Sequence, residues 1–246
     1  MTKLSVNLNK IALLRNQRDI GIPSVVESAK VVITAGVAGI TVHPRPDERH
    51  IRYSDVYELK DTVSCFGGVE YNIEGNPFTG RYMELVKDVQ PDQATLVPDD
   101  PNQNTSDHGW DIDANLERLK PVVEELKLLD IRVSLFMDAE QGIEKAAKAL
   151  ADRVELYTEP YATAFRTGRD LDETLRRFAT AAAAAQDAGL DVNAGHDLNL
   201  ENLGMFLDEV EEVKEVSIGH ALIAEALEMG LYNTVKEYLR ILGSAL

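Results

Sequence analysis

The stretch Gly39-Ile-Thr-Val-His43-Pro-Arg45-Pro-Asp-Glu-Arg-His50 is a short β-branched run that ends on a histidine and enters a loop rich in cations. Eight times along the chain, a similar run ends in polar or turn-forming residues and is followed by a helix-patterned stretch. Strands that alternate with helices predict a parallel sheet, and eight of them fit a closed (β/α)8 TIM barrel. In that fold, chemistry takes place where the strands end.

The eight predicted strands are short, and several are near-continuous apolar runs, as expected for strands covered on both faces. They span Leu4–Leu8, Gly39–Val42, Val69–Ile73, Ala94–Val97, Arg132–Met137, Arg153–Tyr157, Asp191–Asn193 and Val216–Ile218. Between them, Ser24 and Glu27 have the spacing of a capping box, and Asn199 is placed to cap a helix that runs through Leu207. A chain of 246 residues with no linker or composition break is expected to form one domain over residues 1–246.

The charge of the chain is acidic overall but unevenly distributed. The net charge is −17, yet residues 1–52 carry eight Lys or Arg against four Asp or Glu (+4), leaving 17 against 38 (−21) for the rest. Nucleic acids and anionic membranes bind cationic surfaces, so we expect neither as a partner. A local cationic patch on an acidic body suits a small anionic ligand.

Three features bear on where the protein works. The only cysteine, Cys65, allows no intrachain disulfide, which is compatible with a reducing compartment. No apolar run approaches membrane-spanning length. Polar residues interrupt the apolar ones throughout residues 1–10, so a secretory signal is not expected there. The sequence therefore predicts a cytoplasmic protein.

Side chains that can transfer protons lie where the predicted strands end. His43 and His196 suit acid and base chemistry because imidazole titrates near neutral pH. Glu74 follows a buried strand directly, so it should be partly desolvated and suited to act as a base. Barrel closure would bring further polar residues to the same rim, namely Asn7, Asn9, Arg45, Thr105, Asp138, Glu155, Tyr157, Glu159 and His220.

A phosphate site is predicted at Ser217-Ile-Gly219-His220, where strand eight turns through a glycine into a helix. Barrels often bind phosphate at the loops of strands seven and eight, because backbone amides and a helix N-terminus favour an anion there. Asn193-Ala-Gly-His196 adds a second glycine-containing turn on the neighbouring strand. Bidentate contacts to phosphate or carboxylate could come from Arg15, Arg18, Arg45 and Arg52.

The order of motifs resembles the pyridoxine 5′-phosphate synthase family over essentially the whole chain. The matching segments are Val6-Asn7, Leu14-Arg-Asn-Gln-Arg18, Gly39-Ile-Thr-Val-His43, Arg45, Arg49-His-Ile51, Asn72-Ile-Glu74, Leu96-Val-Pro98, Val133-Ser-Leu-Phe136, Val192-Asn-Ala-Gly-His196 and Ile218-Gly-His220. Their order along one chain is much more specific than any single segment.

The resemblance implies condensation of 3-amino-2-oxopropyl phosphate with 1-deoxy-D-xylulose 5-phosphate to pyridoxine 5′-phosphate, phosphate and water, with no cofactor and no metal. It implies that His43 and Glu74 accept protons and that His196 donates one. Positions for the phosphorylated substrates or the product fall on Asn7, Arg18, Arg45, His50, Thr105, Asp197, Gly219 and His220. The resemblance further implies extra helical segments and a homo-octamer built as a tetramer of dimers. The long loop Val97–Trp110 is expected to be a lid that excludes water.

The sequence departs from the common family pattern in three places, which together comprise four residues. The pattern Asn-x-Asp-His reads Asn7-Leu-Asn9-Lys10, so a carboxylate becomes an amide and an imidazole becomes an ammonium. Lys10 can still attract phosphate, and both residues are kept in the predicted binding set, but Asn9 cannot act as a base. Asp197 and Glu159 stand where many members have glycine, and the charge of Asp197 could repel a phosphate.

Two other functions fit the same residues. One is a metal-dependent barrel hydrolase with His43, Glu74, His196 and His220 as ligands, although strand one lacks a His-x-His pair. The other is a non-catalytic binder of phosphorylated metabolites, which the changes at Asn9, Lys10 and Asp197 would permit.

Overall fold

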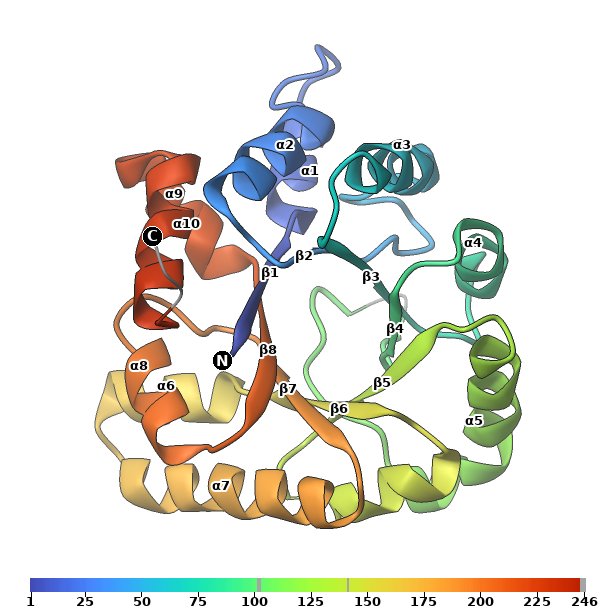
Figure 1. Cartoon of the computed structure of the whole chain (residues 1–246), viewed down its shortest axis with the longest axis vertical. Coiled ribbons are helices and arrows are strands. Elements are labelled where there is room, and N and C mark those ends of the chain that lie inside the picture. Colours follow the sequence, from blue (N-terminus) through green and yellow to red (C-terminus); the bar gives the residue numbers. More distant parts are fainter. Residues whose placement is uncertain (101–102, 141, 244–246) are drawn as a thin grey trace.

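Eight parallel strands form one closed barrel in chain order (Figure 1) in this computed structural model, which describes residues 1–100, 103–140 and 142–243. The strands are β1 Lys3–Asn7, β2 Gly39–Val42, β3 Glu70–Gly75, β4 Gln93–Leu96, β5 Arg132–Met137, β6 Arg153–Tyr157, β7 Asp191–Gly195 and β8 Val213–Ile218. The predicted barrel is confirmed, and the largest shift of a strand end is at β8, which begins at Val213 instead of Val216. Residues 101–102, in the predicted lid, and 244–246, at the end of the predicted domain, lie outside the described ranges.

Helices surround the barrel in Figure 1. They are α1 Asn9–Asn16, α2 Val25–Ala35, α3 Tyr53–Ser64, α4 Tyr82–Val89, α5 Ile112–Lys127, α6 Glu159–Thr167, α7 Leu171–Asp187, α8 Leu203–Glu209, α9 His220–Met229 and α10 Leu231–Ile241. The chain forms two helices instead of one after β1, β6 and β8, so the extra helical segments are confirmed. Between β5 and β6 a 3-10 helix, η1 (Ile143–Ala149), replaces the α-helix that the repeat predicts.

Side-chain caps explain where some helices begin. The Ser24 hydroxyl accepts a hydrogen bond from the Glu27 backbone N–H at 3.2 Å, so the predicted N-cap of α2 is confirmed. The predicted cap at Asn199 is wrong, because α8 begins only at Leu203. The Asn199 side chain instead accepts from the backbone N–H groups of Glu201 and Asn202, both at 2.9 Å, which stabilises a turn before the helix.

Polar side chains link neighbouring strands across the interior of the barrel. The hydroxyls of Ser5 and Thr41 lie 2.7 Å apart, and Asn72 joins Thr41 to Thr95 through its amide group. Gly39 lies opposite Ser5 in the register of β1 and β2, where a Cβ would come within 2.9 Å of the Ser5 hydroxyl oxygen. A glycine is therefore needed at the start of β2 for the two strands to approach.

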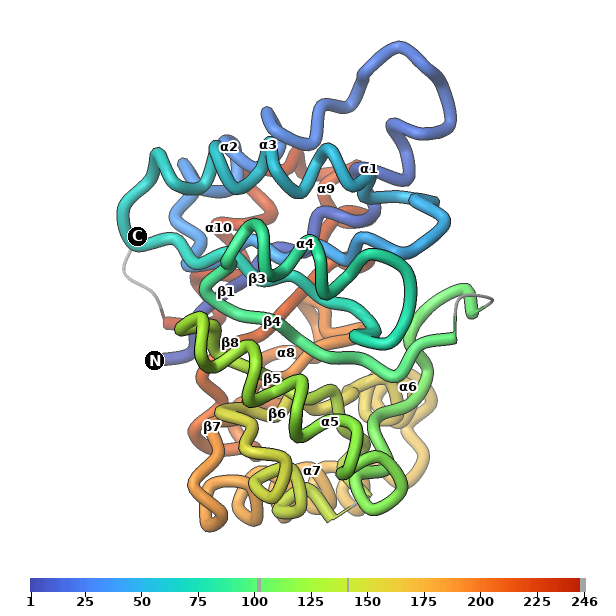
Figure 2. The backbone as a smooth tube through the Cα atoms, turned by 90° about the vertical axis from the view of Figure 1, so that its right-hand side faces the viewer, coloured from blue at the N-terminus to red at the C-terminus, as the bar shows by residue number. Residues whose placement is uncertain are grey.

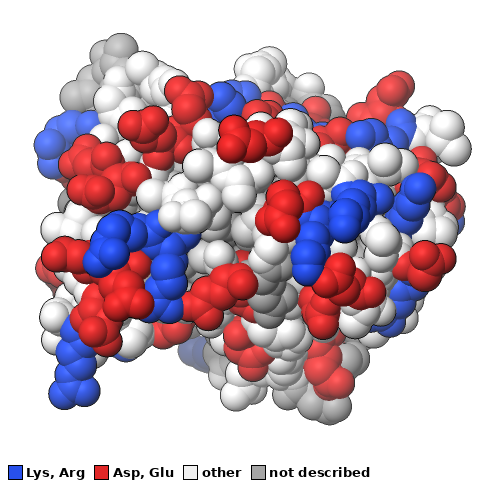
Figure 3. Space-filling model, turned by 90° about the horizontal axis from the view of Figure 1, so that it is seen from below, with Lys and Arg blue, Asp and Glu red and all other residues white. Residues whose placement is uncertain are grey.

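The two ends of the barrel differ. Figure 2 shows the N-terminus at one end, whereas the loop after β4 projects at the opposite end, where the strands finish. Acidic and basic side chains are interspersed on the face seen in Figure 3, which carries no broad basic area. Over the described part of the chain, no helix is both long enough and apolar enough to cross a membrane.

A buried ion pair connects α1 to α3. Arg15 donates to both carboxylate oxygens of Asp55, at 2.5 and 2.9 Å, and to the His50 carbonyl oxygen at 3.1 Å. Asp55 also accepts from the backbone N–H of Arg52 at 2.7 Å, at the start of α3. Arg15 is thus occupied in fixing the loop after β2.

We predict that Asp55→Ala lowers the free energy of unfolding by roughly 3–5 kcal/mol, because it leaves the Arg15 guanidinium buried without its partner. Urea unfolding measures this difference at one fixed protein concentration. Asp61→Ala, which removes an exposed carboxylate from the same helix, is the control and should change the value by less than about 0.5 kcal/mol. Equal effects of the two substitutions would contradict the role assigned to the pair.

Candidate active site

A cavity of about 300 Å³ opens at the carboxyl ends of the strands. Of the thirteen residues predicted from the sequence, it is lined by all except Arg18: Asn7, Asn9, Lys10, His43, Arg45, His50, Glu74, Thr105, His196, Asp197, Gly219 and His220. Arg18 is exposed in the segment after α1, and its predicted phosphate contact stays a prediction. The cavity wall also includes Val97, Asn104, Ser106, Phe136, Glu155 and Ser217.

His43 is buried at the end of β2 between polar groups of neighbouring strands. Its backbone N–H donates to the Asn9 side-chain oxygen at 2.9 Å, so Asn9 ties β2 to the start of α1. The Nδ1 atom lies 3.9 Å from a Glu74 oxygen, and Nε2 lies 3.9 Å from an Asp99 oxygen. Burial, and then the positive charge of Arg45, hold the pKa of His43 well below its usual value, so the ring is a neutral imidazole.

Glu74 lies near the end of β3, and its side chain is only 12% exposed. Asn7 donates to it at 3.3 Å, and Asn7 in turn accepts from the Asn9 backbone N–H at 3.0 Å. Burial raises the pKa of Glu74 to about 8, and the negative charges of Asp99 and Glu215 act in the same direction. Glu74 is therefore a carboxyl group that gains and loses its proton near neutral pH.

Glu155 is one of the polar residues that the sequence places at the barrel rim. It is buried in β6 and lines the cavity, and among the described residues its Oε2 has no hydrogen-bond partner. Burial, and then the negative charges of Glu74 and Glu215, raise the pKa of Glu155 well above its usual value and so favour its protonated form. A Cβ at Gly195 would lie 2.4 Å from the other Glu155 oxygen, which explains the glycine there.

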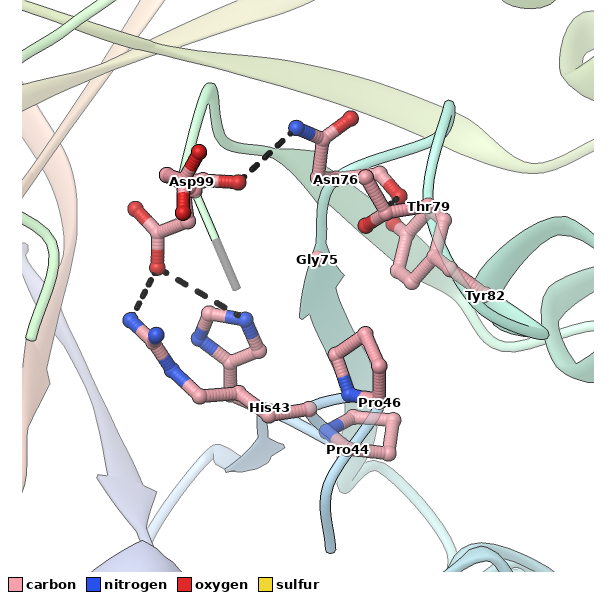
Figure 4. Close-up of a pocket in the computed structure, with 10 residues that line it drawn as sticks. His43, Pro44, Pro46, Gly75, Asn76, Thr79, Tyr82 and Asp99 are labelled. Carbon is pink, nitrogen blue, oxygen red and sulfur yellow. Dashed lines mark hydrogen bonds and ion pairs between the residues drawn. The ribbon is translucent and has the colours of Figure 1, made fainter. Parts of the chain in front are cut away.

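The loop after β2 supplies cations and a histidine to one wall. His50 accepts a hydrogen bond at Nδ1 from the Ile51 backbone N–H at 2.9 Å, so its neutral ring carries the proton on Nε2. Burial, with Arg45 and Lys10 nearby, lowers the pKa of His50 to about 3. Arg45 donates to the Gln103 carbonyl oxygen at 2.7 Å and forms an ion pair with Asp99. Figure 4 shows Asp99 facing the ring of His43 at this wall.

His196 lies directly after β7, with a positive φ of 92°. The Thr158 hydroxyl lies 2.5 Å from the His196 carbonyl oxygen and fixes the turn, and the Tyr157 ring contacts the imidazole edge to face at 5.1 Å. Its Nε2 lies 3.4 Å from the Thr105 hydroxyl in the loop after β4. Burial lowers the pKa of His196, whereas the charges of Asp197 and Asp99 oppose that shift.

The predicted phosphate turn lies at the start of α9. Gly219 precedes the helix, and the first turn of α9 has neither a side-chain cap nor an acidic residue. Its free amides can therefore bind an anion. A Cβ at Gly219 would lie 3.1 Å from the Asn7 Cβ, so a glycine allows β8 to approach β1 closely.

The structure gives another role to one of the arginines that the sequence suggested for phosphate, because Arg15 is paired with Asp55. Arg52 is exposed at the start of α3, and its predicted phosphate contact stays a prediction. Within the described ranges, no group of three or more His, Cys, Asp or Glu side chains is placed to hold a metal ion. Sequence reasoning missed Asp99, although its position two residues after a predicted strand was a signal that could have identified it.

Comparison with known proteins identifies the family. Residues 4–244 match the family described as "Pyridoxal phosphate biosynthesis protein PdxJ". The chain is 53% identical over 245 residues to the pyridoxine 5′-phosphate synthase of Albidiferax ferrireducens, covering 97% of this chain and 96% of that protein. It is 52% identical over 239 residues to the synthase of Bacteroides thetaiotaomicron, covering 97% of this chain and 98% of that protein.

More distant solved structures share the fold alone. KGPDC from Streptococcus mutans superposes with a TM-score of 0.62 at 11% identity, covering 99% of this chain and 98% of that one. Phosphoribosylanthranilate isomerase from Thermotoga maritima does so with a TM-score of 0.59 at 13% identity, covering both chains completely. The match over residues 4–244 and the two close relatives are decisive, and the chain belongs to the PdxJ family of pyridoxal phosphate biosynthesis proteins.

Proposed function

We propose that the protein is a pyridoxine 5′-phosphate synthase that condenses 3-amino-2-oxopropyl phosphate with 1-deoxy-D-xylulose 5-phosphate by acid and base catalysis. The observation that carries the proposal is the pair of His43 and Glu74, a neutral imidazole and a carboxyl group of raised pKa 3.9 Å apart in one cavity. The family to which the chain belongs and its close relatives support the same reaction. The products are pyridoxine 5′-phosphate, inorganic phosphate and water.

The reaction needs several proton transfers around carbonyl groups. Imine formation, loss of water and ring closure each require a proton transfer. Groups whose pKa lies near the working pH catalyse such transfers best. We assign His43 and Glu74 as proton acceptors, since both offer a lone pair once Glu74 is ionised. His196 is the proton donor, and the negative charge of a bound phosphate would raise its pKa toward the cationic form.

Each substrate carries a phosphate, and the cavity has two walls suited to anions. Lys10, Arg45 and His50 line one wall. Gly219 and His220, which line the cavity after β8, are at the start of α9, where backbone amides favour an anion. Asn9 accepts a hydrogen bond from the His43 backbone N–H without carrying a negative charge, and Asp197 is exposed, so these departures are compatible with phosphate binding.

The loop after β4 is proposed to cover the bound substrates. Asn104, Thr105 and Ser106 line the cavity, and the Thr105 hydroxyl lies 3.4 Å from His196 Nε2. Arg45 and Arg49 both donate to the Gln103 carbonyl oxygen at 2.7 Å and hold the loop toward β2. Excluding water would protect reactive intermediates from side reactions.

The protein is also proposed to be cytoplasmic and to form an octamer as a tetramer of dimers. Exposed apolar side chains on α1 and the segment after it support self-association: Leu14 is 52%, Ile20 54% and Ile22 64% exposed. A contiguous exposed apolar patch is a common feature of protein–protein interfaces.

We predict that Glu74→Gln and His196→Asn each lower kcat for pyridoxine 5′-phosphate formation by roughly 10²–10⁴-fold while the fold is retained, because each removes a proton-transfer group. Product formation is measured by chromatography, and folding by circular dichroism. Glu84→Gln, an exposed glutamate on α4, is the control and should leave kcat unchanged. Wild-type rates in either site variant would contradict the assigned roles.

The pH dependence gives a second prediction. A base acts when deprotonated, so kcat/KM should rise with pH through about 8, the raised pKa of Glu74. In Glu74→Gln the remaining activity should lose that rise. The range from pH 6 to 9 extends about two units below and about one unit above that pKa. A wild-type kcat/KM that stays constant over this range would argue against Glu74 as the base.

A metal-dependent hydrolase would use His43, Glu74, His196 and His220, and elemental analysis separates it from the synthase. We expect protein purified without added metal to contain far less than one zinc per chain and to retain synthase activity after chelation. Stoichiometric zinc whose removal abolishes activity would support the hydrolase. A protein that binds both substrates without forming product would instead be a metabolite binder.

Light scattering after size exclusion tests the oligomer. Eight chains of 27.2 kDa give about 218 kDa, and the double variant Ile20→Asp/Ile22→Asp should dissociate because charge replaces exposed apolar surface. Leu128→Asp, at a leucine that is 86% exposed at the end of α5, is the control and should keep the wild-type mass. A wild-type monomer would contradict the octamer.

A further inference from the structure

Asp99 is a buried carboxyl group beside the cavity to which the proposed reaction gives no role. Its side chain is only 5% exposed. One oxygen, Oδ2, accepts from the Arg45 guanidinium and from the Ser106 hydroxyl, the latter at 2.9 Å. The other oxygen, Oδ1, has no hydrogen-bond partner among the described residues. Burying a carboxyl group with an unpaired oxygen costs free energy of folding. Such a group calls for an explanation, and an interaction with a neighbouring side chain would provide one.

The neighbour is His43, which lies between two carboxyl groups. Asp99 Oδ2 is 3.9 Å from Nε2, and Glu74 Oε2 is 3.9 Å from Nδ1, on the opposite side of the ring. The two carboxyl groups have different hydrogen-bond donors around them. Asp99 receives hydrogen bonds from a guanidinium and a hydroxyl, which favour its ionised form, whereas Glu74 has no cationic donor and a pKa of about 8.

A neutral imidazole carries one N–H, and an ionised carboxylate attracts it to the nearer nitrogen. Asp99 therefore favours the proton on Nε2, which leaves the lone pair on Nδ1 directed at Glu74. The distance of 3.9 Å exceeds a hydrogen bond. Hydrogen bonds between catalytic groups are often long without substrate and shorten when substrate is bound. Asp99 also fixes Arg45 on the cavity wall through their ion pair.

We infer that Asp99 is a positioning residue that selects the tautomer of His43 and holds Arg45 against the cavity. This inference rests on the proposed function. It gives one side chain two linked tasks, the orientation of the base and the placement of a phosphate ligand. The backbone of Asp99 is itself fixed, because Asn76 after β3 donates to its carbonyl oxygen at 3.0 Å (Figure 4).

Several charged and polar groups surround Asp99 and influence its pKa. Arg45 and His43 face it from the end of β2 and the loop after it, and Ser106 and His108 from its own loop. His196 acts from β7, and the charge of Asp99 reaches Glu74 on β3. Burial raises the pKa of Asp99, and the Arg45 charge opposes that shift. Loss of the Asp99 charge should lower the pKa of Glu74.

The tautomer is tested without any assay of activity. Protein labelled with ¹⁵N-histidine is sedimented and measured by solid-state NMR at neutral pH, and the His43 signals are assigned by difference with His43→Asn. We expect an unprotonated Nδ1 and a protonated Nε2 in the wild type, and a mixture of tautomers in Asp99→Asn. A His43 tautomer that is the same in both proteins overturns the inference, whatever the reaction turns out to be.

Kinetics test the consequence for catalysis. Asp99→Asn keeps an oxygen for Arg45 and Ser106 but removes the charge, so kcat should fall by roughly 10–100-fold, with a smaller change in KM. The rise of kcat/KM should also move to lower pH, because Glu74 loses a nearby negative charge. Asp99→Glu keeps the charge and should restore most of the activity together with the wild-type pH profile.

The matched control is Asp100→Asn, which removes the neighbouring, exposed carboxyl group and should leave kcat and the pH profile unchanged. If Asp99 only anchors the loop, Ser106→Ala and Asp99→Asn should reduce kcat equally and leave the pH profile in place, and the inference is then wrong. A wild-type protein that makes no pyridoxine 5′-phosphate refutes the proposed function instead, and the NMR measurement still decides the tautomer.

Discussion

The pairing of β1 with β8 is the constraint on which the rest of the structure depends. Four residues of β1, Lys3 to Val6, pair in parallel with Glu215 to Ile218, and this closes the barrel. Closure places the end of β1 beside the end of β8, so close that a Cβ at Gly219 would lie 3.1 Å from the Asn7 Cβ. Without it, the side chains that follow the eight strands would lie along an open edge and could not enclose one cavity.

Burial, more than any single charge pair, sets the chemistry at this rim. It is the largest cause of the lowered pKa of His43, His50 and His196 and of the raised pKa of Glu74 and Glu155. The result is a cavity of neutral acids and bases next to permanent cations. Such a site keeps the imidazoles neutral and leaves Glu74 able to exchange its proton near neutral pH, as the proposed reaction requires. Asn9 fits this pattern, because it holds the His43 backbone without adding a charge.

Much of this could be predicted from the sequence, for physical reasons. The strands were recognisable because a barrel strand is buried on both faces and reads as a short apolar run. Nearly all predicted site residues meet in one cavity because strand ends must converge. Side-chain partners were not predictable: Arg15 turns to Asp55 and Asn199 forms a turn before α8, since both depend on contacts distant in sequence or on local loop geometry. Asp99 was not predicted because the loop after β4 contains several aspartates, and their order in the sequence does not indicate which one becomes buried.

The most direct test of the account is to incubate the purified protein with 3-amino-2-oxopropyl phosphate and 1-deoxy-D-xylulose 5-phosphate and to measure pyridoxine 5′-phosphate over time. The account predicts product that depends on both substrates, accompanied by an equal amount of inorganic phosphate. No product above the background without enzyme, from folded protein that binds both substrates, would contradict it.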